Sequence, residues 1–145
     1  MSSKVMLRFA SGLLFLFALG QIVGHYTHHD SKDMRVQKVL KVMMENKFDM
    51  YGQWRTYDEN YTGMSLNLIF SLLAFSIMLW VLSVFTTRNR VLVRAMLVPI
   101  SFCLLGYSIT GFLFFFPSAA YTSFFAAVLT IVTMFSMVKK NSELK

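Results

Sequence analysis

The residues of this sequence best suited to chemistry are three histidines and an aspartate that follow its first apolar segment: His25, His28, His29 and Asp30. His25 precedes His28 by three positions and His29 by four, so a continued helix would place the imidazoles on one face. Imidazole nitrogens commonly bind zinc, other transition metals and haem iron. The spacing therefore predicts metal-ligand candidates, although it is also typical of a hydrated loop entry at a membrane surface. Acidic residues of the same loop offer further oxygen ligands: Asp49, Asp58 and Glu59.

A second candidate site is an aromatic and charged cluster within residues 54–61. Arg55 and Asp58 are three positions apart, so they can pair on one helical turn. The cluster is either an ion pair with aromatic anchors that orient the loop, or the mouth of a cavity for a lipid or another small hydrophobic molecule. The predicted ligand-binding residues are His25, Trp54, Arg55, Asp58 and Tyr61.

Several kinds of chemistry lack the residues that they need. Cys103 is the only cysteine and lies within an apolar run, so a cysteine-pair redox centre and a disulfide framework are excluded. No acidic residue, lysine or histidine lies deep in an apolar run, where proton-coupled transport generally requires one. We therefore expect no catalytic residues, and a transporter is disfavoured.

Four apolar runs must position the polar residues. The chain has 145 residues, of which 56% are hydrophobic and 14% charged, and the runs cover about 5–24, 64–85, 91–116 and 118–138. Each is long enough to cross about 30 Å of hydrocarbon as a helix. Pro117 ends one run and suits the first turn of the next, which predicts an antiparallel hairpin. The fold class is all-α, a four-transmembrane-helix bundle in a single membrane domain, residues 1–145.

The first run also has features of a cleaved signal peptide, because Lys4 and Arg8 precede it and Ala18-Leu19-Gly20 resembles a cleavage site. Its apolar character continues beyond that site through Ile22 and Val23, so an uncleaved span is preferred.

The basic residues predict the orientation in the membrane. Loop residues 25–63 hold six basic and six acidic residues, whereas one acid accompanies the eight basic residues at the other ends of the runs: Lys4, Arg8, Arg88, Arg90, Arg94, Lys139, Lys140 and Lys145. By the positive-inside rule, the loop is external and both termini are cytoplasmic. The basic residues form no stripe that would indicate a nucleic-acid partner.

The external loop should contain an amphipathic helix that lies on the membrane surface or caps the bundle. Ser31 is its predicted cap, and its apolar residues are Val36, Val39, Leu40, Met43 and Met44. Gly20 and Gly24 form a GxxxG motif that permits close helix packing, either within one chain or in a homo- or hetero-oligomer. Membrane lipid is the other expected partner.

Residues 24–66 resemble a known family. Gly24-His25 closes the first run, residues 47–52 read Lys-Phe-Asp-Met-Tyr-Gly, and residues 55–66 read Arg-Thr-Tyr-Asp-Glu-Asn-Tyr-Thr-Gly-Met-Ser-Leu. This pattern resembles a family of short four-span bacterial membrane proteins of unassigned activity, first labelled from a Leptospira locus. The resemblance implies the same architecture and leaves the activity open. His25, Arg55, Tyr61 and Gly63 correspond to the family's motif positions.

Three functions follow as hypotheses. The first is an accessory membrane protein, or a binder of lipid or of a small hydrophobic ligand, without catalytic activity. The second is a metal- or haem-dependent membrane redox protein that uses His25, His28 and His29. The third, which is disfavoured, is a small transporter. The sequence identifies no cofactor.

Overall fold

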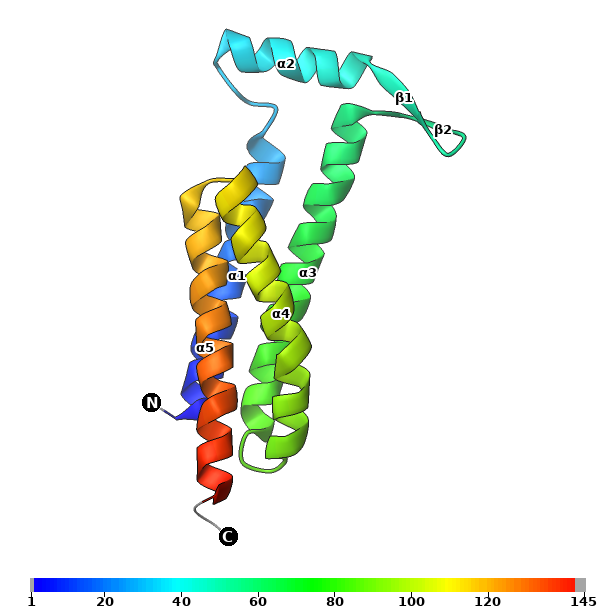
Figure 1. Ribbon diagram of the computed structural model, residues 1–145. Coiled ribbons are helices and arrows are strands. Elements are labelled where there is room, and N and C mark those ends of the chain that lie inside the picture. The colour runs from blue at the N-terminus through cyan, green and yellow to red at the C-terminus, as the bar shows by residue number, and fades with distance from the viewer. Residues whose placement is uncertain (1, 143–145) are drawn as a thin grey trace. The chain divides into compact units, whose positions relative to one another are not determined.

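A computed structural model describes the backbone of residues 2–142 and the side chains of residues 2–137 (Figure 1). The elements, in chain order, are α1 (Ser3–Thr27), α2 (Met34–Glu45), β1 (Lys47–Met50), β2 (Gln53–Thr56), α3 (Tyr57–Phe85), α4 (Arg90–Phe114) and α5 (Pro117–Ser142). Four of the helices, α1, α3, α4 and α5, are long and apolar enough to cross a membrane. The predicted four-span helical architecture is confirmed, and the chain is a multi-pass membrane protein.

The chain forms two compact units, and each is described by itself. The bundle unit comprises Met1–Phe17 and Leu72–Lys145, of which residues 2–17 and 72–142 are described. The loop unit comprises Ala18–Ser71 and contains α2, the β-hairpin, the end of α1 and the start of α3.

The interior of the bundle unit combines leucines with small and hydroxyl side chains. Ser11 Oγ donates to the Ser76 carbonyl oxygen at 2.8 Å, and Ser76 Oγ donates to the Ser11 carbonyl oxygen at 3.0 Å, which joins α1 to α3. Ser101 Oγ lies 2.8 Å from Thr130 Oγ1 and joins α4 to α5. Aromatic side chains such as Phe102 are exposed. Because lipid solvates apolar groups and leaves polar ones unpaired, buried hydroxyl pairs and exposed aromatic side chains suit a membrane bundle.

The predicted α4–α5 hairpin is present. Pro117 is the first residue of α5, where its missing N–H group has no intrahelical partner to lose. Gly111 of α4 packs so closely on α5 that an added Cβ would lie 2.9 Å from Ala120 Cα. Ser108 is buried at the same contact and donates to the Ala120 carbonyl oxygen at 3.4 Å, as expected for a hydroxyl that faces protein.

Helix α3 begins at Tyr57, well before the predicted boundary at residue 64. Glu59 N donates to Thr56 Oγ1 at 3.1 Å, and Thr56 N donates to Glu59 Oε2 at 2.9 Å. This reciprocal pair is a capping box, which supplies partners for two backbone N–H groups at the start of a helix. Hydropathy missed the beginning of the helix because its first turns are polar.

Helix α2 is the predicted loop helix, but it is capped by Asp33 and not by Ser31. Asp33 Oδ1 accepts a hydrogen bond of 2.8 Å from Arg35 N, whereas Ser31 Oγ accepts from Asp33 N. An aspartate in this position satisfies a free N–H group of the first turn, and it displaces the start of the helix by two residues. No residue of α2 is buried, so its apolar face is left accessible.

Strands β1 and β2 form an antiparallel hairpin that the sequence analysis did not predict. Lys47 pairs with Thr56 and Met50 with Gln53, so two residues make the turn. Those residues, Tyr51 and Gly52, both have positive φ, as a type I′ hairpin turn requires. Each strand has only four residues, too few for an alternating pattern to stand out.

Gly20 and Gly24 make no close helix contact within the described residues. Both are exposed, and no described side chain lies within 4 Å of a Cβ added at either position. The close helix contact within the chain is made at Gly111, so the GxxxG motif remains a predicted contact between chains.

Candidate functional site

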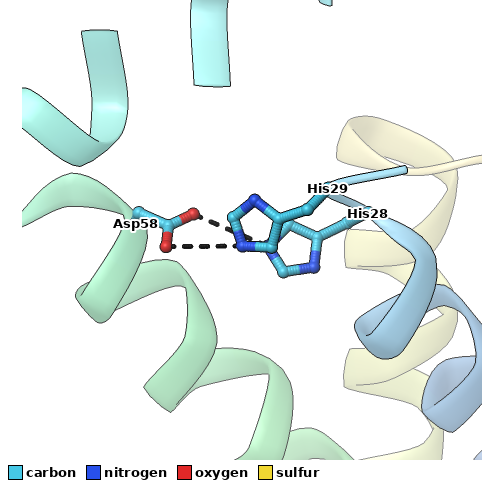
Figure 2. A group of neighbouring side chains, drawn as sticks. All are labelled: His28, His29 and Asp58. Carbon is cyan, nitrogen blue, oxygen red and sulfur yellow. Dashed lines mark ion pairs between the residues drawn. The ribbon is translucent and has the colours of Figure 1, made fainter. Parts of the chain in front are cut away.

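The loop unit brings two histidines and one aspartate together at the meeting point of α1 and α3. Helix α1 ends at Thr27, and His28 and His29 occupy the turn that follows. Asp58 lies in the first turn of α3, which the capping box fixes. Figure 2 shows both imidazole rings directed toward the Asp58 carboxylate.

Each histidine of this cluster places its Nε2 atom at nearly the same distance from an oxygen of Asp58. His28 Nε2 is 3.5 Å from Asp58 Oδ1, and His29 Nε2 is 3.6 Å from Asp58 Oδ2. The two imidazole rings lie with their centroids 3.7 Å apart. One ligand atom from each of the three residues lies within 4.8 Å of the others. The three residues therefore bring two imidazole nitrogens and the two carboxylate oxygens of Asp58 close together.

The hydrogen bond made by Nδ1 determines which tautomer the neutral His28 ring adopts. His28 Nδ1 lies 2.5 Å from the His25 carbonyl oxygen, which is an acceptor only, so Nδ1 carries a hydrogen and donates it. In the neutral ring, Nε2 then holds a lone pair and no hydrogen. A backbone carbonyl that orients a histidine in this way is a common outer partner of metal-bound imidazoles.

Two buried acceptors consequently face each other. His28 Nε2 and Asp58 Oδ1 are shielded from solvent, and neither has a hydrogen-bond partner. Buried polar atoms normally have one, because leaving such an atom unpaired costs about 1–3 kcal/mol. A lone pair and a carboxylate repel unless a cation lies between them. The arrangement thus calls for a shared positive charge.

A metal ion fits the spacing better than a shared proton does. A charge-assisted N–H···O bond is about 2.7–2.9 Å long, which is shorter than the separations found here. Two ligands that are each about 2.0–2.1 Å from a tetrahedral zinc ion lie about 3.4 Å apart. The 3.5 Å and 3.6 Å separations are close to that value.

One side of the cluster is open to solvent. The His28 and Asp58 side chains are 15% and 16% exposed, whereas His29 is 41% exposed. The Tyr61 ring, one turn along α3 from Asp58, lies with its centroid 5.5 Å from that of His28, and Tyr61 is 46% exposed. Three protein ligands with an accessible fourth position are typical of sites where a metal exchanges water or substrate.

The remaining metal-ligand candidates lie outside this triad. His25 lies in the last turn of α1, and its Nδ1 is 3.1 Å from Ser65 Oγ. Asp30 is exposed, and its backbone N–H donates to the Thr27 carbonyl oxygen. The expected continuous helix through all three histidines is wrong, since α1 ends before His28. The turn nevertheless brings the His28 and His29 rings to the same carboxylate.

The structure separates the residues of the predicted ligand-binding cluster. Asp58 faces the histidines, and Arg55 lies on β2, where its Nη2 donates to Gln53 Oε1 at 3.3 Å. The predicted Arg55–Asp58 ion pair does not form, because the two side chains belong to different elements. Trp54 is 67% exposed on β2. Arg55 borders a separate hollow of about 310 Å³ with Met50, Glu59, Asn60, Gly63, Met64 and Asn67.

The sequence predicted Asp58 as a possible oxygen ligand and as a partner of Arg55, but it did not join Asp58 to His28 and His29. The signal that would have selected it is the Thr56-x-x-Glu59 capping pattern, which starts α3 before Asp58 and fixes this residue in the first turn. No sequence signal identified Ser65 as the partner of His25, because that contact joins residues 40 positions apart.

Comparison with known proteins adds no relative: the chain matches no protein-family model, no curated protein and no solved structure.

Proposed function

We propose that this membrane protein binds a divalent transition-metal ion through His28 Nε2, His29 Nε2 and a carboxylate oxygen of Asp58. The observation that carries the proposal is the pair of buried acceptors, His28 Nε2 and Asp58 Oδ1, that face each other 3.5 Å apart without a hydrogen bond. The nitrogen and oxygen ligands suit zinc and other first-row metals, and they do not suit metals that prefer sulfur.

The ion would stabilise the fold and could also take part in a reaction. It would tie the turn after α1 to the first turn of α3, in addition to the His25–Ser65 contact between the two helices. With an open position beside the exposed His29, it would also polarise a bound water molecule or a carbonyl oxygen. Within the residues described, His29 also borders a hollow that is lined by Gln37, Leu40 and Met44 of α2.

We place the site on the external side of a bacterial inner membrane, with both chain termini in the cytoplasm. This orientation is supported by the excess of basic residues at the opposite ends of the spans and by the balanced charge of loop residues 25–63. An external site would draw its metal from outside the cytoplasm.

The test is zinc binding by the full-length protein, purified in a neutral detergent and stripped with a chelator. Equilibrium dialysis should give one tightly held ion per chain for the unsubstituted protein. Loss of an outer partner typically weakens a metal site about 10–100-fold, so loss of a direct ligand in His28→Ala or Asp58→Asn should weaken zinc binding by at least about 100-fold.

Asp30→Asn is the matched control, because Asp30 is a nearby loop aspartate that lies outside the triad. It should bind zinc like the unsubstituted protein. The proposal is wrong if the unsubstituted protein binds no zinc, or if Asp30→Asn loses as much affinity as Asp58→Asn.

A second candidate function is the binding of a small amphiphile beside Arg55. The hollow around Arg55 favours it, since it combines a cationic group with amides and with the thioether side chains of Met50 and Met64. Mass spectrometry of molecules retained through gentle purification tests this function. Arg55→Gln should release the retained molecule, whereas Lys47→Gln on the neighbouring strand should keep it.

A further inference from the structure

A hollow of about 450 Å³ lies beside the triad of His28, His29 and Asp58, within the loop unit. Its lining joins one member of the triad to three successive turns of α2 (Figure 1), and consists of His29, Gln37, Leu40 and Met44. The His29 side chain is 41% exposed. The accessible side of the triad therefore meets the hollow at His29.

The α2 side of the hollow is mainly apolar. Leu40 is half-buried and Met44 is exposed, although both lie on the apolar face of an amphipathic helix. No residue of α2 is buried, so this face stays accessible to a ligand. Small-molecule sites of about 300–1,000 Å³ are typically lined by apolar side chains, with a few polar groups that orient the ligand. The hollow has this size and this composition.

Gln37 supplies the polar group on the α2 side. Its Nε2 donates a hydrogen bond of 2.9 Å to the Ser31 carbonyl oxygen, which orients the amide. An amide nitrogen carries a second hydrogen, which can be donated to a ligand oxygen. The wall of the hollow thus offers one hydrogen-bond donor and two apolar side chains.

The charge of the proposed metal site favours an anion at its open position. A divalent ion that is bound by two neutral imidazoles and one carboxylate keeps one positive charge uncompensated. A singly charged oxygen ligand neutralises this charge, and zinc accepts carboxylate oxygens at about 2.0–2.2 Å. Because the neighbouring wall is apolar, the anion that fits best also carries a hydrocarbon chain.

We infer that the metal ion of the triad binds the carboxylate of a fatty acid, whose hydrocarbon chain lies against Leu40 and Met44. The inference rests on the proposed metal site, because the ion supplies the positive charge that holds the carboxylate. Gln37 donates to the second carboxylate oxygen. Two apolar side chains make room for a single hydrocarbon chain, so a fatty acid fits better than a phospholipid with two chains.

The experiment uses the full-length protein in a neutral detergent, loaded with one equivalent of cobalt(II) in place of zinc. The visible absorption of cobalt(II) changes when a ligand of the ion is exchanged, so it reports carboxylate binding at the metal. Octanoate and acetate are the probes, because they share the carboxylate and differ in chain length. A buried methylene raises affinity about fourfold, so burial of about two should make octanoate bind at least about tenfold more tightly than acetate.

Leu40→Gln tests the apolar wall. It should weaken octanoate binding about tenfold and leave the affinities for acetate and cobalt unchanged, because it removes apolar contact but no metal ligand. Met44→Gln should act in the same direction, and it replaces Leu40→Gln if that variant fails to fold. Detergent micelles take up octanoate in every sample, so all variants are compared at the same detergent concentration.

Val42→Gln is the matched control, since Val42 is an apolar residue of α2 that is 53% exposed and lies outside the lining of the hollow. It should bind octanoate like the unsubstituted protein. Equal loss of octanoate binding in Val42→Gln and Leu40→Gln would overturn the inference. Equal affinity of the unsubstituted protein for octanoate and acetate would overturn it too, because the site would then bind small anions without recognising the chain.

Cobalt affinity, measured separately by equilibrium dialysis, distinguishes this inference from the metal site on which it rests. Absence of cobalt binding would overturn both. Cobalt binding with an absorption spectrum that octanoate leaves unchanged would overturn the fatty-acid site alone.

Discussion

At the scale of single residues, the proposed metal site depends on how one imidazole is held. The His25 carbonyl oxygen accepts the hydrogen of His28 Nδ1, so in the neutral ring Nε2 holds a lone pair opposite Asp58. The turn after α1 and the start of α3 bring His28 Nε2 and Asp58 Oδ1 to 3.5 Å from each other, and the proposal depends on this approach.

The sequence identified the histidines but not their arrangement. Helical spacing favoured His25 as a ligand, yet this residue pairs with Ser65, while His28 and His29 reach Asp58 from a turn. Spacing rules assume that a helix continues, and α1 ends at Thr27. Partners such as Asp58 and Ser65 are distant along the chain, so local patterns carried little information about them.

Gly111 gives a residue-scale prediction about the α4–α5 hairpin. An added Cβ would lie 2.9 Å from Ala120 Cα, so Gly111→Ala must push the helices apart. Overpacking of this kind costs about 1–3 kcal/mol. Gly106→Ala is the control on the same helix, because nothing lies within 4 Å of its added Cβ.

Thermal unfolding in detergent, followed by circular dichroism, should show a lower melting temperature for Gly111→Ala than for Gly106→Ala. Equal melting temperatures would mean that the close contact between α4 and α5 is absent in solution.

At the scale of elements, hydropathy predicted the membrane spans well and the polar ends of the helices poorly. The centres of α1, α3, α4 and α5 match the predicted runs, because a span needs about 20 apolar residues in a row. The first turns of α3 are polar and depend on the Thr56–Glu59 capping box. Hydropathy carries no information about such a cap, although the sequence pattern does.

The capping box should influence the metal site at a distance. Thr56→Ala removes the hydroxyl that accepts from Glu59 N, and loss of such a cap costs about 1 kcal/mol. The first turn of α3 should then fray and carry Asp58 with it. Amide hydrogen exchange of residues 57–60 should become faster, and zinc should bind about fivefold more weakly if the whole cap energy is coupled to the site.

Thr62→Ala controls for the loss of a threonine from the same helix, and it should leave exchange and zinc affinity unchanged. Unaltered exchange in Thr56→Ala would show that the cap does not hold the first turn.

At the scale of the whole molecule, acidic and basic residues are distributed unequally between the two units. Six of the seven acidic residues lie in the loop unit, and the remaining one, Glu143, is outside the described residues. The bundle unit is basic at one end and apolar along its spans. This asymmetry could be predicted from the sequence, because counting charges requires no knowledge of side-chain contacts.

The orientation follows as a prediction for the intact protein. With Cys103→Ser as background, Lys41→Cys should react with a membrane-impermeant maleimide added to intact cells, and Arg88→Cys should react only after permeabilisation. Lys41 is well exposed on α2, so its substitution should not disturb the fold. Labelling of both positions from the same side would contradict the four-span topology.

The central claim is that His28, His29 and Asp58 hold one metal ion, and zinc X-ray absorption on the full-length protein loaded with one equivalent tests it most directly. We predict a first shell of nitrogen and oxygen at about 2.0–2.1 Å, with the outer-shell scattering of two imidazole rings. In His28→Ala the imidazole scattering should fall. A spectrum without imidazole scattering, or one in which sulfur at about 2.3 Å dominates, would contradict the account.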